Sequence, residues 1–295
     1  MPTKQNIYPV AGVLSGALVW GLIWYPYRVL QEAGVSGALA TAITFFIAML
    51  CGAAWLPKLW RELPNLGWWA ALLLLSAGGA NFGYVLAMLH GDVMRVLLLF
   101  YLAPLWTVLL SYFLLNERLN CYGYVVIALS VFGAIVMLWN PQQGWPIPQT
   151  LSEWLGMAAG ICFALSNVVS RRAAHMSMEA KSYSVWVGTV VLTLPLLWFQ
   201  GGNLELMSSI APLDWLLLVI LGGVMCAVSY AVQYGVTHLP ANRAMLLFLS
   251  ELVVAAVTSY FLAGEEMALR DWMGAALIVS ASLFSGRIHA DERSD

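Results

Sequence analysis

Ten long apolar runs, separated by short polar gaps, constrain this chain more than any other feature. An α-helix needs about 20 apolar residues to cross the hydrocarbon core of a bilayer, and each run approaches that length. Only 9% of the 295 residues are charged, against roughly 25% in soluble domains. The sequence therefore predicts an all-α membrane protein with ten transmembrane helices. The predicted spans are residues 8–28, 37–57, 67–89, 94–115, 120–139, 153–172, 181–200, 213–236, 242–263 and 269–286.

The distribution of Lys and Arg predicts how the chain is oriented. With ten spans, three basic residues fall on the side opposite the N-terminus, namely Arg28, Arg95 and Arg270. The other ten fall on the side of both termini: Lys4, Lys58, Arg61, Arg118, Arg171, Arg172, Lys181, Arg243, Arg287 and Arg293. Cytoplasmic loops carry the excess of Lys and Arg. We therefore expect a multi-pass protein of a bacterial-type inner membrane, with the N- and C-termini in the cytoplasm.

Two of the predicted spans share residues at one constant offset. The first copy contains Arg95-Val-Leu-Leu-Leu-Phe100, Ser111-Tyr-Phe-Leu114 and Glu117. The second copy, 148 residues later, contains Arg243-Ala-Met-Leu-Leu-Phe248, Ser259-Tyr-Phe-Leu262 and Glu265. Because this offset covers five spans, an odd number, the second copy must enter the membrane from the opposite side. The fold class predicted is thus two inverted five-helix repeats, which are typical of transporters with a site near the bilayer midplane.

A linker near the middle of the chain separates the two repeats. It begins with Asn140-Pro-Gln-Gln-Gly-Trp-Pro-Ile-Pro-Gln149, where Pro and Gly cannot continue a helix. We therefore predict a first repeat in residues 1–139, a linker in 140–152 and a second repeat in 153–295.

Several short motifs carry a resemblance to a known family. They are Leu18-Val-Trp-Gly-Leu22, Tyr101-Leu-Ala-Pro104 followed by Leu115-Asn-Glu117, and Ser250-Glu-Leu252 followed by Ala263-Gly-Glu265. In these motifs the chain resembles the drug/metabolite transporter (DMT) superfamily in its EamA-type branch, and the resemblance covers nearly the whole chain. The sequence departs from the family at Leu252, where many members have Pro, and at Asn116, where many have Gly.

The resemblance implies a secondary transporter with a central cavity and alternating access. It also implies small metabolites as substrates, and the nearest members are exporters of amino acids, aromatic or other neutral ones. Export or facilitated passage of other small organic compounds or drugs is the alternative. A membrane enzyme or a lipid flippase-like protein would need polar catalytic clusters at an interface, which the sequence lacks.

Glu251 is the first candidate for substrate binding because it is an acidic residue well inside an apolar run. An ionised carboxylate at mid-bilayer costs about 3 kcal/mol on insertion scales, so such acids face a cavity or a partner. The carboxylate could contact a substrate amine or carry a coupled proton. Alternatively, it is a structural group that is hydrogen bonded between packed helices.

Aromatic and uncharged polar side chains complete the candidate substrate site. The aromatic rings could stack on a planar substrate or a cation, and the polar groups could bind the ligand. The alternative is that they hold helices together, which polar side chains also do in membranes. The candidates are Trp20, Trp24, Asn81, Tyr84, Tyr101, Ser166, Asn167, Tyr230 and Tyr234.

A second group of residues is expected to act in gating or structure. Pro104 lies inside a predicted span, where it would kink the helix. Arg95 and Arg243 begin two spans and are expected to cap the membrane interface. Glu117 and Glu265 end the same two spans, where a negative charge opposes the helix dipole, so we expect them to cap another helix or to pair with Arg.

Composition and motifs also predict several absences. The sequence lacks a Gly-Lys-Ser/Thr phosphate loop and a basic block, which argues against ATP hydrolysis and nucleic-acid binding. It also lacks the spacing of a metal site. We therefore expect no enzymatic activity, no cofactor and no metal. The expected partners are a small-molecule substrate and the lipid bilayer, with a monomer as the expected state and a dimer as the alternative.

Overall fold

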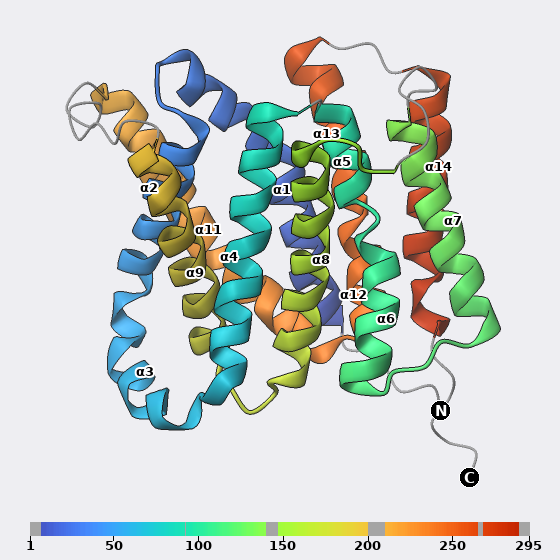
Figure 1. Cartoon of the computed structure of the whole chain (residues 1–295), viewed down its shortest axis with the longest axis horizontal. Coiled ribbons are helices and arrows are strands. Elements are labelled where there is room, and N and C mark those ends of the chain that lie inside the picture. The colour runs from blue at the N-terminus through green and yellow to red at the C-terminus, as the bar shows by residue number, and fades with distance from the viewer. Residues whose placement is uncertain (1–6, 92, 140–146, 200–209, 265–267, 289–295) are drawn as a thin grey trace.

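The computed structural model describes residues 7–91, 93–139, 147–199, 210–264 and 268–288, which form helices and connecting turns without any strand among them (Figure 1). Each predicted apolar run coincides with a helix or with a pair of consecutive helices. The helices are α1 (Ile7–Glu32), α2 (Gly37–Cys51), α3 (Leu56–Glu62), α4 (Gly67–His90), α5 (Val93–Phe100), α6 (Ala103–Leu115), α7 (Cys121–Leu138), α8 (Leu151–Arg172), α9 (Met178–Phe199), α11 (Pro212–His238), α12 (Ala241–Phe248), α13 (Ser250–Ala263) and α14 (Leu269–Phe284).

Eight helical stretches in the described part of the chain are long and apolar enough to cross a membrane. Two predicted spans, 181–200 and 269–286, lie outside this set of eight. They correspond to α9 and to α14, of which α14 has only 16 residues. The outer surface of the bundle is apolar, with Phe113, Phe261 and Leu283 each more than 70% exposed. An apolar surface of this extent suits contact with lipid.

Two predicted spans are interrupted in the middle by residues in a turn conformation. Residues 94–115 form α5 and α6 with a break at Tyr101 and Leu102, and residues 242–263 form α12 and α13 with a break at Leu249. The sequence predicts that Pro104 kinks a helix, and this prediction is wrong. It lies in the first turn of α6, where the missing N–H would have had no helical partner.

The boundaries of these helices recur at the offset found in the sequence. Residues 93, 100, 115 and 121 bound α5, α6 and the start of α7, and residues 241, 248, 263 and 269 bound their counterparts. The residues after α6 and α13, Asn116 and Gly264, both have a left-handed backbone with φ of 56° and 67°. Only Gly and, less readily, Asn adopt this conformation at a helix end, which explains why Asn can stand there.

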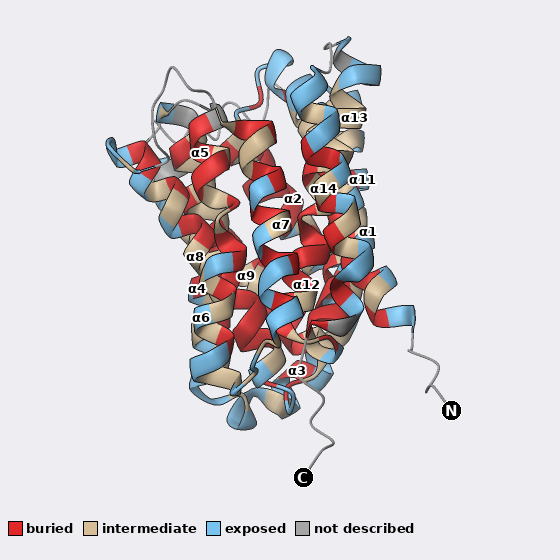
Figure 2. Ribbon diagram, turned by 90° about the vertical axis from the view of Figure 1, so that its right-hand side faces the viewer, coloured by how far each residue is buried: buried red, intermediate tan, exposed pale blue. Residues whose placement is uncertain are grey.

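The main packing lies between the first and second halves of the chain. Helix α4 packs against α8 and α9, α1 packs against α11 and α13, and α7 packs against α14. Buried segments line the inside of the bundle, and exposed ones lie on its outer faces and ends (Figure 2). In Figure 1, the pair α5–α6 descends through the bundle and the pair α12–α13 ascends beside it.

Close contact between α4 and α9 depends on glycine. A Cβ atom on Gly188 of α9 would come closer than 3.0 Å to the backbone carbonyl of Leu74, and one on Gly78 of α4 would come as close to Gly188 itself. The glycines that the sequence spaces as Gly12/Gly16 and Gly156/Gly160 also lie at tight helix contacts. Lipid provides no hydrophobic drive for helices to associate, so their association depends on close packing. Small residues make such packing possible.

The first prediction concerns this contact. We expect Gly188→Ala to destabilise the protein by about 1–3 kcal/mol, because α4 must move away to admit a methyl group. Gly223→Ala in α11 is the matched control, since nothing lies within 4 Å of the position that its Cβ would take. Thermal unfolding in detergent measures both variants. A Gly188→Ala protein as stable as Gly223→Ala would contradict the close packing of α4 on α9.

Candidate functional site

The two helix breaks meet in the interior of the protein. Tyr101 lies in the break between α5 and α6, and Glu251 is the second residue of α13, directly after the other break. Tyr101 and Tyr84 of α4 both lie close enough to the Glu251 carboxyl group for an electrostatic interaction. A carboxyl group and two phenols thus converge from α4, from the first break and from α13.

The surroundings of Glu251 suit both a negative charge and a ligand. Because it lies in the first turn of α13, its carboxylate is at the positive end of the helix dipole. Glu251 and Tyr84 are enclosed by protein, and yet both keep an intermediate exposure to solvent. Glu251 and Tyr84 therefore lie within the bundle without being fully buried. This position fits a group that meets a small molecule within the protein.

A continuous chain of aromatic rings extends from this carboxyl group to α1. Its members come from α1, α4, α5, α8, α12 and the first helix break, so both halves of the chain contribute. The ring-centroid distances are 5.3 Å for Phe100–Tyr101, 5.2 Å for Tyr84–Phe100, 5.6 Å for Phe100–Phe163, 5.4 Å for Phe163–Phe248 and 5.8 Å for Trp20–Phe248. The structure therefore brings together Trp20, Tyr84, Tyr101 and Glu251 among the predicted site residues.

Three members of this chain were missed as site residues by the sequence reasoning. Phe100 and Phe248 were noted only as markers of the repeat, and Phe163 was not singled out. The repeat itself was the available signal, because Phe100 and Phe248 occupy equivalent positions and each is the last residue before a helix break. Phe163 of α8 stacks on Phe100 and lies edge-on to Phe248, so it joins the two equivalent positions.

The other aromatic candidates lie elsewhere. The Trp24 indole nitrogen donates a hydrogen bond of 3.0 Å to the Thr258 hydroxyl, which ties α1 to α13. Tyr230 contacts Trp55, with 5.4 Å between ring centroids, in a second aromatic cluster that also contains Tyr183 and Trp186 of α9. The Tyr234 ring lies against that of His238, one turn later in α11, with 4.2 Å between ring centroids and a tilt of 36° between the rings.

The polar candidates make hydrogen bonds within the protein. The Asn81 amide donates to the Thr189 hydroxyl of α9 at 3.0 Å and to a carbonyl one turn back in α4. Ser166 and Asn167 are buried and both donate to the carbonyl of Phe163 in their own helix. These contacts agree with the structural alternative for the three residues, because each group already has a partner.

Two ion pairs, one buried and one partly exposed, hold the opposite ends of α8. At its start, Glu153 Oε1 lies 2.9 Å from Arg95 Nε, with both side chains less than 10% exposed, and Arg95 also donates to the Ile147 carbonyl. At its end, Arg171 pairs with Glu117 and donates to the Thr237 carbonyl at 3.2 Å. We call these the Arg95 latch and the Arg171 latch. Each latch joins helices of the first half to helices of the second half.

Glu117 also caps a helix, although not the one that follows it in sequence. Its carboxylate accepts a hydrogen bond of 2.9 Å from the backbone N–H of Ala241, at the start of α12. The two roles expected for this residue, capping and pairing with Arg, are therefore both seen. Arg243 lies in the first turn of α12, and Glu265, which follows Glu117 at the offset of 148 residues, lies outside the described residues. The described residues contain no cluster of His, Cys, Asp or Glu that could hold a metal ion.

Comparison with known proteins identifies the family of this chain. Residues 8–139 and 150–287 each match the model of the EamA-like transporter family. An uncharacterized transporter of Archaeoglobus fulgidus is 27% identical over 72% of this chain and 76% of its own length. An S-adenosylmethionine uptake transporter of Rickettsia prowazekii is 26% identical over 75% of this chain and 71% of its own length.

The fold also has a counterpart among solved structures. A crystal structure with 20% sequence identity covers 94% of this chain and 97% of its own, with a TM-score of 0.70. At that identity the likeness concerns the fold alone. The family model, in contrast, matches almost the whole sequence in two successive segments. The chain is therefore a multi-pass membrane transporter that belongs to the EamA-like transporter family of the DMT superfamily.

Proposed function

We propose that the protein is a secondary transporter that moves small metabolites by alternating access around the Tyr101–Glu251 contact. In this proposal ten helices form two inverted repeats, residues 1–139 and 153–295, with both termini in the cytoplasm. The observation that carries it is the meeting of two helix breaks at a carboxyl group, because discontinuous helices build the binding sites of many inverted-repeat transporters. The equal spacing of the helix ends and the opposite directions of α5–α6 and α12–α13 support the inversion.

The chemistry of the site favours substrates that combine an amino group with an apolar or aromatic body. The Glu251 carboxylate can accept hydrogen bonds from a substrate ammonium group, and the neighbouring rings can stack on an aromatic side chain. Aromatic and other neutral amino acids meet both conditions, and we propose their export as the function. Other small organic compounds with a basic group would fit the same pair of features.

S-adenosylmethionine is a second candidate substrate. Relatives from several Rickettsia species are named as uptake transporters for it. Its sulfonium cation would be attracted to the carboxylate and to the faces of the rings, and its planar base can stack. This candidate requires the same residues but the opposite net direction of transport.

Glu251 provides the direct test of the proposed site. In proteoliposomes, we expect Glu251→Gln to lower the uptake of labelled phenylalanine or S-adenosylmethionine about tenfold or more, because a hydrogen bond to a charged group is worth about 1.5–3 kcal/mol. Trp20→Ala should raise KM about fivefold, because the loss of one aromatic contact with the substrate costs about 1 kcal/mol.

Glu32→Gln is the matched control, since Glu32 is 70% exposed and pairs only with Arg28 one turn away among the described residues. It should transport as the wild type does. Wild-type transport by Glu251→Gln, with a normal unfolding temperature, would show that the substrate does not meet this carboxylate.

The latches are proposed as the two gates of the transport cycle. Each one joins the halves at one end of α8, so each must break when its own side opens. The Arg171 latch lies at the end of the bundle that the basic residues assign to the cytoplasm, and the Arg95 latch lies at the other end. This gives a role to residues that the sequence marked for gating, while Pro104 acts only by starting α6.

Thiol labelling can test the gates separately. In a background without native cysteines, Tyr84→Cys places a thiol within the bundle, close to Glu251. We expect Glu117→Gln to speed labelling by an impermeant maleimide from the Arg171 side about tenfold, because a charge-assisted contact worth about 1.5–3 kcal/mol no longer holds that side closed. Arg95→Gln should speed labelling from the opposite side only. Equal effects of both variants on both sides would exclude separate gates.

A further inference from the structure

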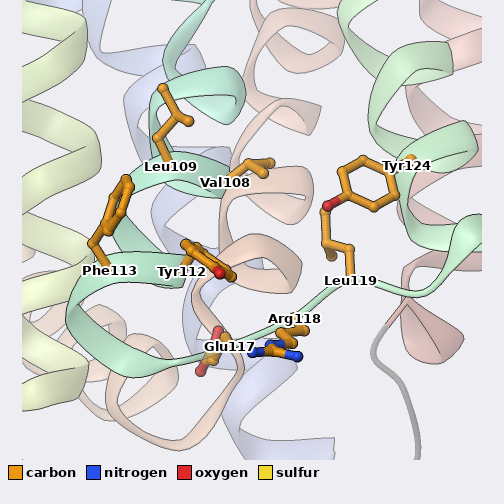
Figure 3. Close-up of a pocket in the computed structure, with 8 residues that line it drawn as sticks. All are labelled: Val108, Leu109, Tyr112, Phe113, Glu117, Arg118, Leu119 and Tyr124. Carbon is orange, nitrogen blue, oxygen red and sulfur yellow. The ribbon is translucent and has the colours of Figure 1, made fainter.

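A groove on the outer face of the bundle lies outside the proposed substrate site, although Glu117 in its lining also belongs to the Arg171 latch. It lies between the end of α6 and the start of α7 and has a volume of about 480 Å³ (Figure 3). This volume falls in the range of small-molecule sites. Val108, Leu109, Tyr112 and Phe113 of α6 form one wall, and Tyr124 of α7 faces them. The opposite face of α6, with Thr107 and Ser111, is buried towards the interior.

The groove changes from polar to apolar along its length. Arg118, in the connection between α6 and α7, lies at the end of the groove where α6 ends and α7 begins. Leu109 and Phe113 are 51% and 74% exposed, and they line the groove along α6 away from that end. In a membrane-spanning bundle, helix ends lie at the interface and exposed apolar faces meet the acyl chains. The groove therefore has a charged end at the headgroup level and an apolar wall in the hydrocarbon.

Arg118 supplies the positive charge at the charged end of the groove. Glu117 lines the groove as well, but its carboxylate is used by Arg171 and by the N–H of Ala241. The Arg118 guanidinium lies over the Tyr112 ring, 5.9 Å from its centroid. Within the described segments, no carboxylate lies within ion-pair distance of Arg118. An anionic group at this end would therefore gain an attractive partner without displacing a protein carboxylate.

We propose that this groove is a binding site for one anionic phospholipid. The guanidinium of Arg118 holds the lipid phosphate, for which Arg is well suited because its planar donors can bind two oxygens at once. One acyl chain lies along Leu109 and Phe113. The charge and the apolar wall together select this occupant, since a soluble anion would leave the wall exposed and a zwitterionic lipid would gain less from Arg118.

The test uses the purified full-length protein in detergent with added phosphatidylglycerol or phosphatidylcholine of equal chain length. Native mass spectrometry counts the lipids retained, and thermal unfolding measures stabilisation. Phosphatidylglycerol should bind and stabilise the wild type more than phosphatidylcholine does. Arg118→Gln should weaken phosphatidylglycerol binding about fivefold, the loss expected for one basic residue at an anionic headgroup.

Two variants complete the design. Arg172→Gln is the matched control, because Arg172 is also exposed and lies over a ring, that of Trp69 at 5.6 Å, but does not line the groove. It should bind phosphatidylglycerol as the wild type does. Leu109→Trp fills the apolar part without changing charge, and it should also lose the retained lipid. The proposal is overturned if the wild type retains both lipids equally, if Arg118→Gln and Arg172→Gln behave alike, or if Leu109→Trp retains phosphatidylglycerol as the wild type does.

Discussion

The hydrocarbon core offers no hydrogen-bond partners, so a break in a membrane helix is tolerated only where protein surrounds it. The part of the chain that the structure describes contains two such breaks, between α5 and α6 and between α12 and α13, and both lie inside the bundle. Around the first, the N–H of Tyr101 still bonds to Leu97, and the N–H of Leu105 bonds back to Leu102. Around the second, Leu249 and Leu252 are likewise bonded to carbonyls within the helix pair. The need to enclose these segments draws α1, α4 and α8 around them and brings Tyr101 to Glu251.

Helix α8 links this interior to the two ends of the bundle. Its middle carries Phe163, which lies between Phe100 and Phe248, and its ends carry Glu153 and Arg171. A buried ion pair adds little net stability, since desolvation offsets most of its attraction, but it strongly favours one arrangement of its partners. Ion pairs of this kind suit a protein whose two halves must keep one relative position and then change to another.

In the candidate site, residue type alone does not predict which side chains could bind a ligand. Asn81, Ser166 and Asn167 are polar groups within apolar helices, a pattern that fits both ligand binding and helix association. In the structure they bond to Thr189 or to their own helix, which leaves the aromatic residues and Glu251 as the groups that face the interior. Tyr230 was also a candidate for substrate binding, but it contacts Trp55 at the end of η1 (Gly52–Trp55).

The sequence by itself determined the helical class, the positions of the apolar segments, the duplication at an offset of 148 and the family. These properties depend on composition and local spacing, because the apolar length and the residue spacing of a segment decide whether it can form a helix in lipid. It could not determine that the runs around Tyr101 and Leu249 are broken, because the breaks are stabilised by neighbours far away in the chain. Only the tertiary structure decided that Glu117 pairs with Arg171 and caps α12, and that Glu251 meets Tyr101. Each of these contacts joins residues more than 50 positions apart, and nothing in local sequence specifies which distant partner a buried charge will find.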